Sequence, residues 1–154
     1  MNQRIFELFD YQDGKLLWRV SRGRIRAGDE AGAVIPNGRL YVQFDGKKYL
    51  VHRVIWFLHH GECPQFLDHI DGNPLNNRIE NLRAATKAQN AMNRRVRADS
   101  STGIKGITPK GKRFGACIYV DGAAKYLGTF DSADLAQAAY AAAANKHFKE
   151  FARV

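Results

Sequence analysis

Short hydrophobic runs interrupted by polar residues follow one another along the chain, which is the pattern of half-buried strands. Residues 40–44 place Leu, Val and Phe on one face, Asp45-Gly46 predicts a tight turn, and residues 47–51 return as the second strand. Asp13-Gly14 likewise predicts a turn, followed by a strand over residues 14–20. The pattern therefore predicts small antiparallel sheets in the first part of the chain.

Helical periodicity is found in four places. Residues 2–9 and 52–59 are predicted helices, and the second should pack its apolar side chains inward. Thr86-Lys87-Ala88-Gln89 has the spacing of a capping box, so a helix should begin at Thr86. A last helix should begin at Asp131, with Asp131 as its N-cap. Strands and helices in this order predict a mixed α+β fold.

Residues 104–154 are predicted to form three short antiparallel strands followed by the last helix. The helix side chains that we expect to face the sheet are mostly alanine: Leu135, Ala138, Ala139, Ala142 and Ala143. The matching sheet face would carry Phe114, Ala116, Ile118 and Val120. The other face of the sheet, with Gly115, Cys117, Tyr119 and Tyr126, would stay uncovered in so small a domain.

Composition narrows the possible functions. Of 154 residues, 24 are Lys or Arg and 15 are Asp or Glu, which gives a net charge of +9 and favours a polyanionic partner such as nucleic acid. No run of 18 apolar residues is present, so we expect no membrane-spanning helix, and the N-terminal residues lack the pattern of a signal peptide. The cysteines, Cys63 and Cys117, are too few for a disulfide framework or a zinc site. We therefore expect a cytoplasmic protein.

The charge indicates two domains that are both cationic. Residues 1–98 have a net charge of +6, and residues 99–154 have a net charge of +3. Residues 94–103 are first basic and then small and polar, as in an exposed linker. We predict a first domain over residues 1–98 with its central motif at 52–93, a basic linker at 94–103, and a second domain over 104–154.

Residues 66–93 contain one His, two Asp and six Asn, a composition that suits neither a helix nor a strand. Asp71-Gly72-Asn73-Pro74 explains part of it as a turn, which leaves Asp68, His69, Asn81 and Asn90. Carboxylate and carboxamide oxygens are ligands for an ion of the Mg²⁺ type, so Asp68 and Asn90 are candidate metal ligands. Neutral His69 could accept a proton from water attacking a phosphodiester, with the Asn81 carbonyl accepting from its Nδ1–H. This set predicts metal-assisted phosphodiester hydrolysis.

These residues resemble the HNH family of ββα-metal endonucleases, especially the homing-endonuclease branch of phages and introns. The resemblance lies in HRVIW at 52–56 and DHIDGNPLNNRIENLRAATKAQN at 68–90, with Asn90 where the family often has a second His. It implies Asp68 and Asn90 as ligands of one Mg²⁺ or Mn²⁺ ion, His69 as general base and Asn81 as its orienting residue. It also implies an endonuclease that nicks duplex DNA, in the host-cell cytoplasm if the gene belongs to a phage.

The second domain resembles the DNA-binding domain of plant ethylene-response factors, the APETALA-two class. The matching segments are KGI at 105–107, FGACI at 114–118 and YLGTFDSADLAQAAYAAAA at 126–144. The resemblance implies a sheet that enters the major groove of DNA, with Gly115, Cys117 and Tyr119 where the family has larger polar or basic residues. The candidate DNA contacts in the whole chain are Arg53, Arg94, Arg95, Arg97, Lys105, Lys110, Lys112, Arg113, Tyr119 and Tyr126.

Two other functions of the protein stay open, and so does the role of His52. A DNA-binding regulator with a decayed nuclease half would not need Asp68, His69, Asn81 and Asn90 together, and a structure-selective RNA nuclease would prefer RNA to duplex DNA. His52 lies at a strand–helix junction, where a structural role and a contact with substrate are both compatible with the sequence. For partners we expect double-stranded DNA, no membrane and no small-molecule cofactor, and a monomer with a dimer as the alternative.

Overall fold

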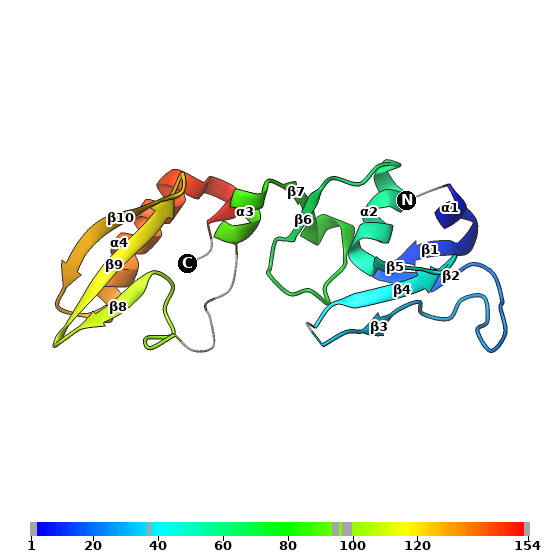
Figure 1. Ribbon diagram of the computed structural model, residues 1–154, viewed down its shortest axis with the longest axis horizontal. Helices are drawn as coiled ribbons and strands as arrows, with labels where there is room; N and C mark the ends of the chain where they lie inside the picture. Colours follow the sequence, from blue (N-terminus) through cyan, green and yellow to red (C-terminus); the bar gives the residue numbers. More distant parts are fainter. Residues whose placement is uncertain (1–2, 37, 94–95, 97–99, 153–154) are drawn as a thin grey trace. The chain divides into compact units, whose positions relative to one another are not determined.

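Four small antiparallel sheets and the helices beside them make up the computed structural model, which describes residues 3–36, 38–93, 96 and 100–152. The fold is α+β, as predicted (Figure 1). The chain divides into two compact units, residues Met1–Ala85 and Thr86–Val154.

The first unit begins with helix α1, Arg4–Leu8, and two hairpins joined by a loop. Asp13-Gly14 and Asp45-Gly46 form the predicted turns, with φ positive at all four residues. The strands are β1 (Phe9–Gln12) paired with β2 (Lys15–Trp18), and β4 (Leu40–Phe44) between β3 (Ala33–Val34) and β5 (Lys47–Leu50).

Helix α2, Val51–His60, follows β5 directly and ends at Gly61, which adopts the left-handed conformation of a helix C-cap. Its apolar face is buried in the core of the first unit, where Val54 and Ile55 are completely inaccessible to solvent. Ile5, Phe9, Leu16 and Phe44 from the two hairpins and α1 belong to the same core. The two hairpins, α1 and α2 therefore pack around one hydrophobic core, and strand β6 follows α2 along the chain.

The unusual Asn-rich region of the first unit is a hairpin with a long connection. Strand β6, Phe66–His69, pairs with β7, Leu82–Ala85, so that Asp68 lies opposite Arg83 and His69 lies opposite Leu82. A loop and the short 3₁₀ helix η1, Ile79–Asn81, join the two strands. The prediction that Asp68 and His69 end a strand is confirmed.

The second unit opens with helix α3, Lys87–Met92. The capping box predicted from the sequence is present, because the Thr86 hydroxyl accepts from Gln89 N and Gln89 Oε1 accepts from Thr86 N. The three strands are β8 (Ile107–Lys110), β9 (Arg113–Val120) and β10 (Ala123–Phe130), with β9 in the centre. The predicted three-stranded sheet is therefore confirmed.

Helix α4, Ala133–Phe148, covers one face of this sheet and is followed by the 3₁₀ helix η2, Lys149–Phe151 (Figure 1). Its N-cap is Ser132, whose hydroxyl accepts from Leu135 N, rather than Asp131. The alanine stripe predicted to face the sheet is wrong, since Leu135 is 56% exposed. The buried helix residues are instead Ala136, Tyr140, Ala144 and Phe148, a ridge with i, i+4 spacing.

The sheet face opposite α4 is the predicted uncovered one. Ala116, Ile118 and Val120 are buried beneath the helix, whereas Tyr119 and Tyr126 are 69% and 58% exposed. No helix within the described ranges combines the length and hydropathy needed to cross a membrane.

Candidate active site and nucleic-acid interface

The loop between β6 and β7 is organised around the Asp71 carboxylate. Asp71 accepts hydrogen bonds from Asn73 N at 2.7 Å, from Asn76 Nδ2 at 2.7 Å and from Asn81 Nδ2 at 2.9 Å, and its own backbone N–H donates to Asn81 Oδ1 at 3.0 Å. Burial raises the pKa of Asp71, but these hydrogen bonds outweigh that effect and hold the pKa below its usual range. The density of Asn in this segment is thus largely explained by loop formation.

His69, at the end of β6, is buried at the base of this loop and its ring is held by Asn77. The His69 Nε2 and Asn77 Oδ1 atoms are 3.0 Å apart, and the Asn77 side chain is almost completely buried. An amide oxygen can only accept, so this bond requires the proton on Nε2 and leaves the lone pair of the neutral ring on Nδ1. The geometry therefore makes Nδ1 the basic nitrogen of His69.

Asn77 takes the place that we had expected for Asn81. The Asn81 carboxamide is used within the loop, where it contacts Asp71 and donates to the Asn76 carbonyl at 2.7 Å. The structure pairs His69 Nε2 with Asn77 Oδ1, in place of the hydrogen bond that the sequence predicts from His69 Nδ1–H to the Asn81 carboxamide oxygen. The basic nitrogen differs for the same reason, since an Asn81–Nδ1 bond would have left Nε2 as the base.

His52, in the first turn of α2, packs edge-on against the His69 ring. The two ring centroids are 5.0 Å apart and the rings are inclined at 70°. Burial, followed by the nearby charges of His69, Arg39 and Arg53, lowers the pKa of His52 to about 3, so this imidazole is neutral at physiological pH. Burial likewise lowers the pKa of His69, against the opposing effects of its Asn77 hydrogen bond and of Asp71 and Asp68. The site thus contains two neutral imidazoles in contact.

Asp68 is buried beside His69 and forms an ion pair with Arg83. The Arg83 Nε and Nη2 atoms lie 3.0 and 2.9 Å from Asp68 Oδ2, across the β6–β7 hairpin. Sequence reasoning missed Arg83, although pairing residues 66–69 with 82–85 in register would have placed it opposite Asp68. A buried carboxylate that already has a cationic neighbour is held in a fixed orientation, which suits a ligand.

Asn90, the second candidate metal ligand, lies on α3 in the second unit, so its pairing with Asp68 stays a prediction. In the part of the chain that the structure describes, no three His, Cys, Asp or Glu side chains gather closely enough to hold a metal ion. The residues nevertheless fit an ion of the Mg²⁺ type by their chemistry, because Asp68 supplies a carboxylate oxygen in a fixed position and such ions complete their shell with water and phosphate.

The candidate DNA contacts fall into two groups. Some already have partners within the protein: Arg53 donates to the backbone carbonyls of Pro64 and Gln65, and Lys105 donates to the Met92 carbonyl. Arg113 is paired with Asp131 at 2.8 Å, although both side chains are exposed. Arg94, Arg95 and Arg97 lie outside the described residues.

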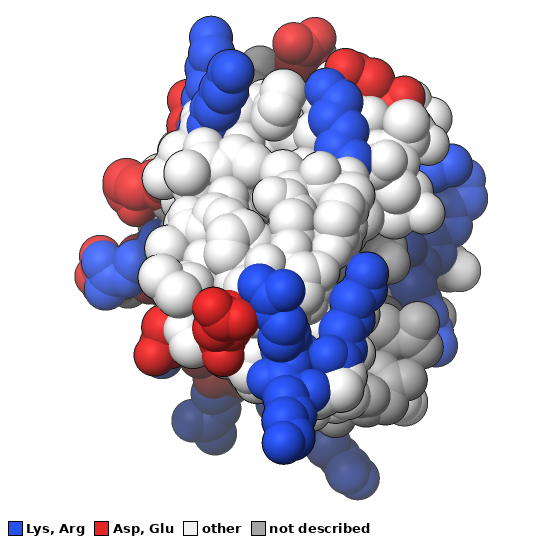
Figure 2. Space-filling model, turned by 90° about the vertical axis from the view of Figure 1, so that its left-hand side faces the viewer, with Lys and Arg blue, Asp and Glu red and all other residues white. Residues whose placement is uncertain are grey.

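The second group lies on the uncovered face of the three-stranded sheet. Lys110 Nζ is 4.6 Å from the centroid of the Tyr126 ring. Lys112, at the β8–β9 turn, and Tyr119, near the other end of β9, are also exposed. Figure 2, which faces the side where β8, β9 and β10 are drawn in Figure 1, shows a broad uncharged surface with Lys and Arg side chains along parts of its border. Aromatic rings bordered by cations are a surface suited to nucleic acid.

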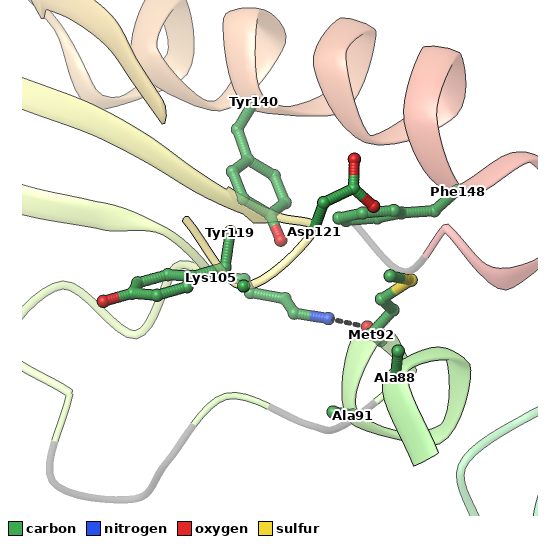
Figure 3. A pocket seen from close by; sticks show the side chains of 9 residues that line it. Ala88, Ala91, Met92, Lys105, Tyr119, Asp121, Tyr140 and Phe148 are labelled. Carbon is green, nitrogen blue, oxygen red and sulfur yellow. Dashed lines mark hydrogen bonds between the residues drawn. The ribbon is translucent and has the colours of Figure 1, made fainter. Parts of the chain in front are cut away.

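A pocket of the second unit opens beside this sheet face, with a volume of about 310 Å³ (Figure 3). Its walls come from α3, β9, the β9–β10 turn and α4. Two of the candidate DNA contacts, Lys105 and Tyr119, lie on its lining. Sequence reasoning did not anticipate this pocket, because the residues that line it come from separate segments of the chain.

Comparisons with known proteins match the part of the chain that contains these residues. Residues 49–92 match the family model described as HNH endonuclease, a segment that includes α2, the β6–β7 hairpin and α3. The chain is 37% identical to Protein 3.8 of Escherichia phage T7 over 59 residues, which are 37% of this chain and 49% of that protein. It is 32% identical over 114 residues to an uncharacterized HNH endonuclease of Acanthamoeba polyphaga mimivirus, covering 72% of this chain and 59% of the relative.

The chain therefore spans about half of the length of the first relative and about three fifths of the second. No solved structure matches it. The matches support an HNH nuclease segment at residues 49–92, whereas the likeness of residues 104–154 to ethylene-response factors, the homing type and the boundaries of the domains stay predictions.

Proposed function

We propose that this protein is a metal-dependent DNA endonuclease of the HNH type that hydrolyses one phosphodiester bond per encounter. The observation that carries the proposal is the buried pair Asp68 and His69 at the end of β6, with His69 fixed by Asn77, inside the segment that matches the HNH endonuclease model. A carboxylate ligand next to a neutral, oriented imidazole is the arrangement that metal-assisted hydrolysis requires.

His69 acts as the general base in this proposal. Its Nδ1 accepts the proton of a water molecule that attacks phosphorus, while the Nε2–H bond to Asn77 keeps the ring in the correct tautomer and orientation. Burial of the ring lowers its pKa, which favours the neutral, proton-accepting form of the imidazole. His52 packs against one side of the ring and limits its rotation.

Asp68 and Asn90 would hold one Mg²⁺ or Mn²⁺ ion, which when bound polarises the scissile phosphate and stabilises the departing alkoxide. Arg83 keeps the Asp68 carboxylate in place through Oδ2. Asn81 contributes indirectly, because it secures the loop that carries Asn77. Asp71 has its hydrogen-bonding capacity taken up by the same loop and is not proposed as a ligand.

Duplex DNA is the proposed substrate, and the uncovered sheet face of the second unit is its proposed docking surface. Lys110, Lys112, Tyr119 and Tyr126 would contact the strand, with Arg113 exchanging Asp131 for phosphate. One cluster of reacting groups per chain predicts a nick from a monomer. A homing-type role in the cytoplasm of a host cell belongs to the same proposal.

The test is a nicking assay on supercoiled plasmid with the full chain. We expect conversion to open-circular DNA in the presence of Mg²⁺, no conversion in EDTA, and recovery when Mg²⁺ is added in excess of the chelator. Cleavage that is unaffected by EDTA would contradict the metal requirement. Binding of duplex DNA without any cleavage would instead identify a DNA-binding regulator, and preferential cleavage of RNA would identify an RNA nuclease.

A further inference from the structure

The pocket of the second unit is built mainly from apolar and aromatic groups. Ala88, Ala91 and Met92 of α3 form one side, and Tyr140 and Phe148 of α4 form the other (Figure 3). Tyr140 and Phe148 are 4% and 6% exposed, so their positions are fixed by the helix–sheet packing. The pocket's volume of about 310 Å³ lies at the lower end of the range for small-molecule pockets, which leaves room for one planar ring system.

The pocket is not purely apolar, because polar groups are directed toward its interior. The Tyr140 hydroxyl points into it (Figure 3), and no hydrogen bond joins this hydroxyl to any residue in the described ranges. The Asp121 carboxylate and the Lys105 ammonium group lie at its border, the latter donating to the Met92 carbonyl. A flat ligand with hydrogen-bonding groups on its edge could bond to the Tyr140 hydroxyl, whereas a purely apolar ligand would displace water from it without replacing that hydrogen bond.

Tyr119 links the pocket to the outer face of the sheet. Its side chain alternates with buried Ile118 and Val120, so it projects from the uncovered face, and it also lines the pocket. Strand β8 begins at Ile107, opposite Ala116, so β9 extends beyond it toward Tyr119 and leaves this end of the sheet open on the pocket side. A strand lying on the sheet face would therefore pass the entrance of the pocket.

The electrostatic setting favours a ligand attached to an anionic backbone. Residues 86–154 include 12 Lys or Arg and 5 Asp or Glu. Two residues expected to contact DNA, Lys105 and Tyr119, line the pocket itself. An aromatic wall, a hydroxyl directed into the pocket and a cationic surround match the chemistry of a nucleobase that stacks through its face and forms hydrogen bonds through its edge.

We propose that this pocket binds a single unpaired nucleobase of a DNA strand that lies on the outer face of the three-stranded sheet. The inference rests on the DNA binding in the proposed function, but not on cleavage. It makes DNA with an extrahelical nucleotide the preferred substrate, because a base that is already unpaired enters without the cost of leaving the helical stack.

The test compares two short duplexes that differ in one group only. Each has one extra nucleotide in one strand, which carries adenine in the first duplex and is abasic in the second. Binding to the full chain is measured by fluorescence anisotropy in EDTA at one salt concentration. We expect the duplex with the adenine bulge to bind about 5-fold more tightly or better, since stacking of one base on aromatic side chains contributes at least that much.

Ala91→Trp fills the pocket without removing any contact, and it should abolish the preference for the adenine bulge while leaving the affinity for the abasic duplex unchanged. Ala138→Trp is the matched control, because Ala138 is equally an exposed helical alanine but does not line the pocket, and it should retain the preference. Tyr140→Phe should reduce the preference without abolishing it. If Ala91→Trp does not fold, as judged by circular dichroism, Ala88→Trp serves in its place.

Equal affinity of the parent chain for the two duplexes would overturn the inference, and so would a preference that survives in the filled variants. Competition by free deoxyadenosine monophosphate as strong as that by the adenine bulge would show a mononucleotide site instead. A preference seen in a chain that never cleaves DNA would refute the proposed hydrolysis alone. Failure to bind any duplex would refute both proposals.

Discussion

Asn77 helps to orient the His69 ring, because it accepts the hydrogen bond that selects the tautomer. We predict that Asn77→Ala lowers the rate constant for plasmid nicking by about 10- to 100-fold, as expected for loss of a group that orients a reacting side chain. DNA affinity in EDTA should not change, since Asn77 is buried and cannot reach the strand.

The control for this prediction is Asn81→Ala. The Asn81 side chain forms hydrogen bonds within the loop, to Asp71 and to the Asn76 carbonyl. Its main effect should be a lower free energy of unfolding, with a smaller effect on the rate constant. If Asn81→Ala lost more activity than Asn77→Ala while remaining folded, the assignment of the orienting role to Asn77 would be wrong.

The buried His52 side chain should make the free energy of unfolding depend on pH. Its pKa is about 3 in the folded chain, where it faces His69, Arg39 and Arg53, against about 6.5 for a His in the unfolded chain. The unfolded state therefore binds the extra proton between these values, and the free energy of unfolding should fall as pH decreases from about 6.5, by at most about 1.4 kcal/mol per pH unit from this group.

Urea denaturation between pH 4.5 and 7.5 measures this slope. We expect His52→Gln to reduce it and His147→Gln, which replaces an exposed His, to leave it unchanged. A slope that is identical in the parent and in His52→Gln would show that His52 is not the group responsible.

Sequence reasoning at the residue scale selected Asp68 and His69 as candidates because they follow an apolar run and have no turn function. It assigned the orienting role to Asn81 rather than Asn77, because both lie in the same Asn-rich segment and the partner of His69 depends on how the loop folds. The Asp71 carboxylate draws Asn76 and Asn81 toward itself, and this leaves Asn77 to face His69. Arg83 was missed because its role arises from strand register.

At the scale of the elements, the packing of the second unit depends on a close approach between the start of β8 and α4. A Cβ atom at Gly106 would lie 2.4 Å from the Tyr140 ring and 2.5 Å from the Cys117 carbonyl oxygen, and its φ is +73°. We predict that Gly106→Ala lowers the free energy of unfolding by roughly 2 kcal/mol or more, through overpacking added to backbone strain.

Gly111→Ala is the matched control, because Gly111 has a φ of +62° but no atom within 4 Å of the added Cβ. It should carry only the backbone cost of about 1 kcal/mol. Equal losses for the two variants in urea denaturation would show that contact with Tyr140 plays no part.

The hairpins and the capping box could be predicted because their signals are local: Asp-Gly turns, alternation over a few residues, and the Thr86–Gln89 spacing. The buried face of α4 could not be predicted, because alanines lie on all sides of this helix and no single side is clearly apolar. Tyr140 and Phe148 decide the face, because only these large side chains fill the space beside the sheet, and that space is known only from the tertiary structure.

On the scale of the whole molecule, the net charge of +9 should act through contacts with phosphate. We predict that Lys110→Gln and Lys112→Gln each weaken duplex binding and each reduce the slope of log affinity against log salt by about 0.9, the value for one phosphate contact. Lys48→Gln, on a strand of the first unit, should leave the slope unchanged.

Anisotropy titrations at several salt concentrations give these slopes. An unaltered slope in both sheet variants would show that the sheet face is not the docking surface. The charge excess was visible from composition, but its distribution was not, because Arg53 and Lys105 are used in contacts within the protein.

The division of the molecule was anticipated only in part. The compact units meet between Ala85 and Thr86, and the predicted linker at 94–103 lies further along the chain, so the predicted domain boundaries stay a prediction. Within the second unit, helix α3 packs against η2. These segments are about 60 residues apart in the sequence, so no local pattern reveals the contact. The HNH match at residues 49–92 extends across this division.

The most direct test of the proposed hydrolysis is the nicking rate constant of His69→Ala, with DNA affinity measured in EDTA on the same preparation. The account predicts a loss of roughly 10²- to 10⁴-fold in rate with unchanged affinity, because the substitution removes the base and no contact with the strand. A His69→Ala chain that nicks plasmid within a few-fold of the parent would contradict it.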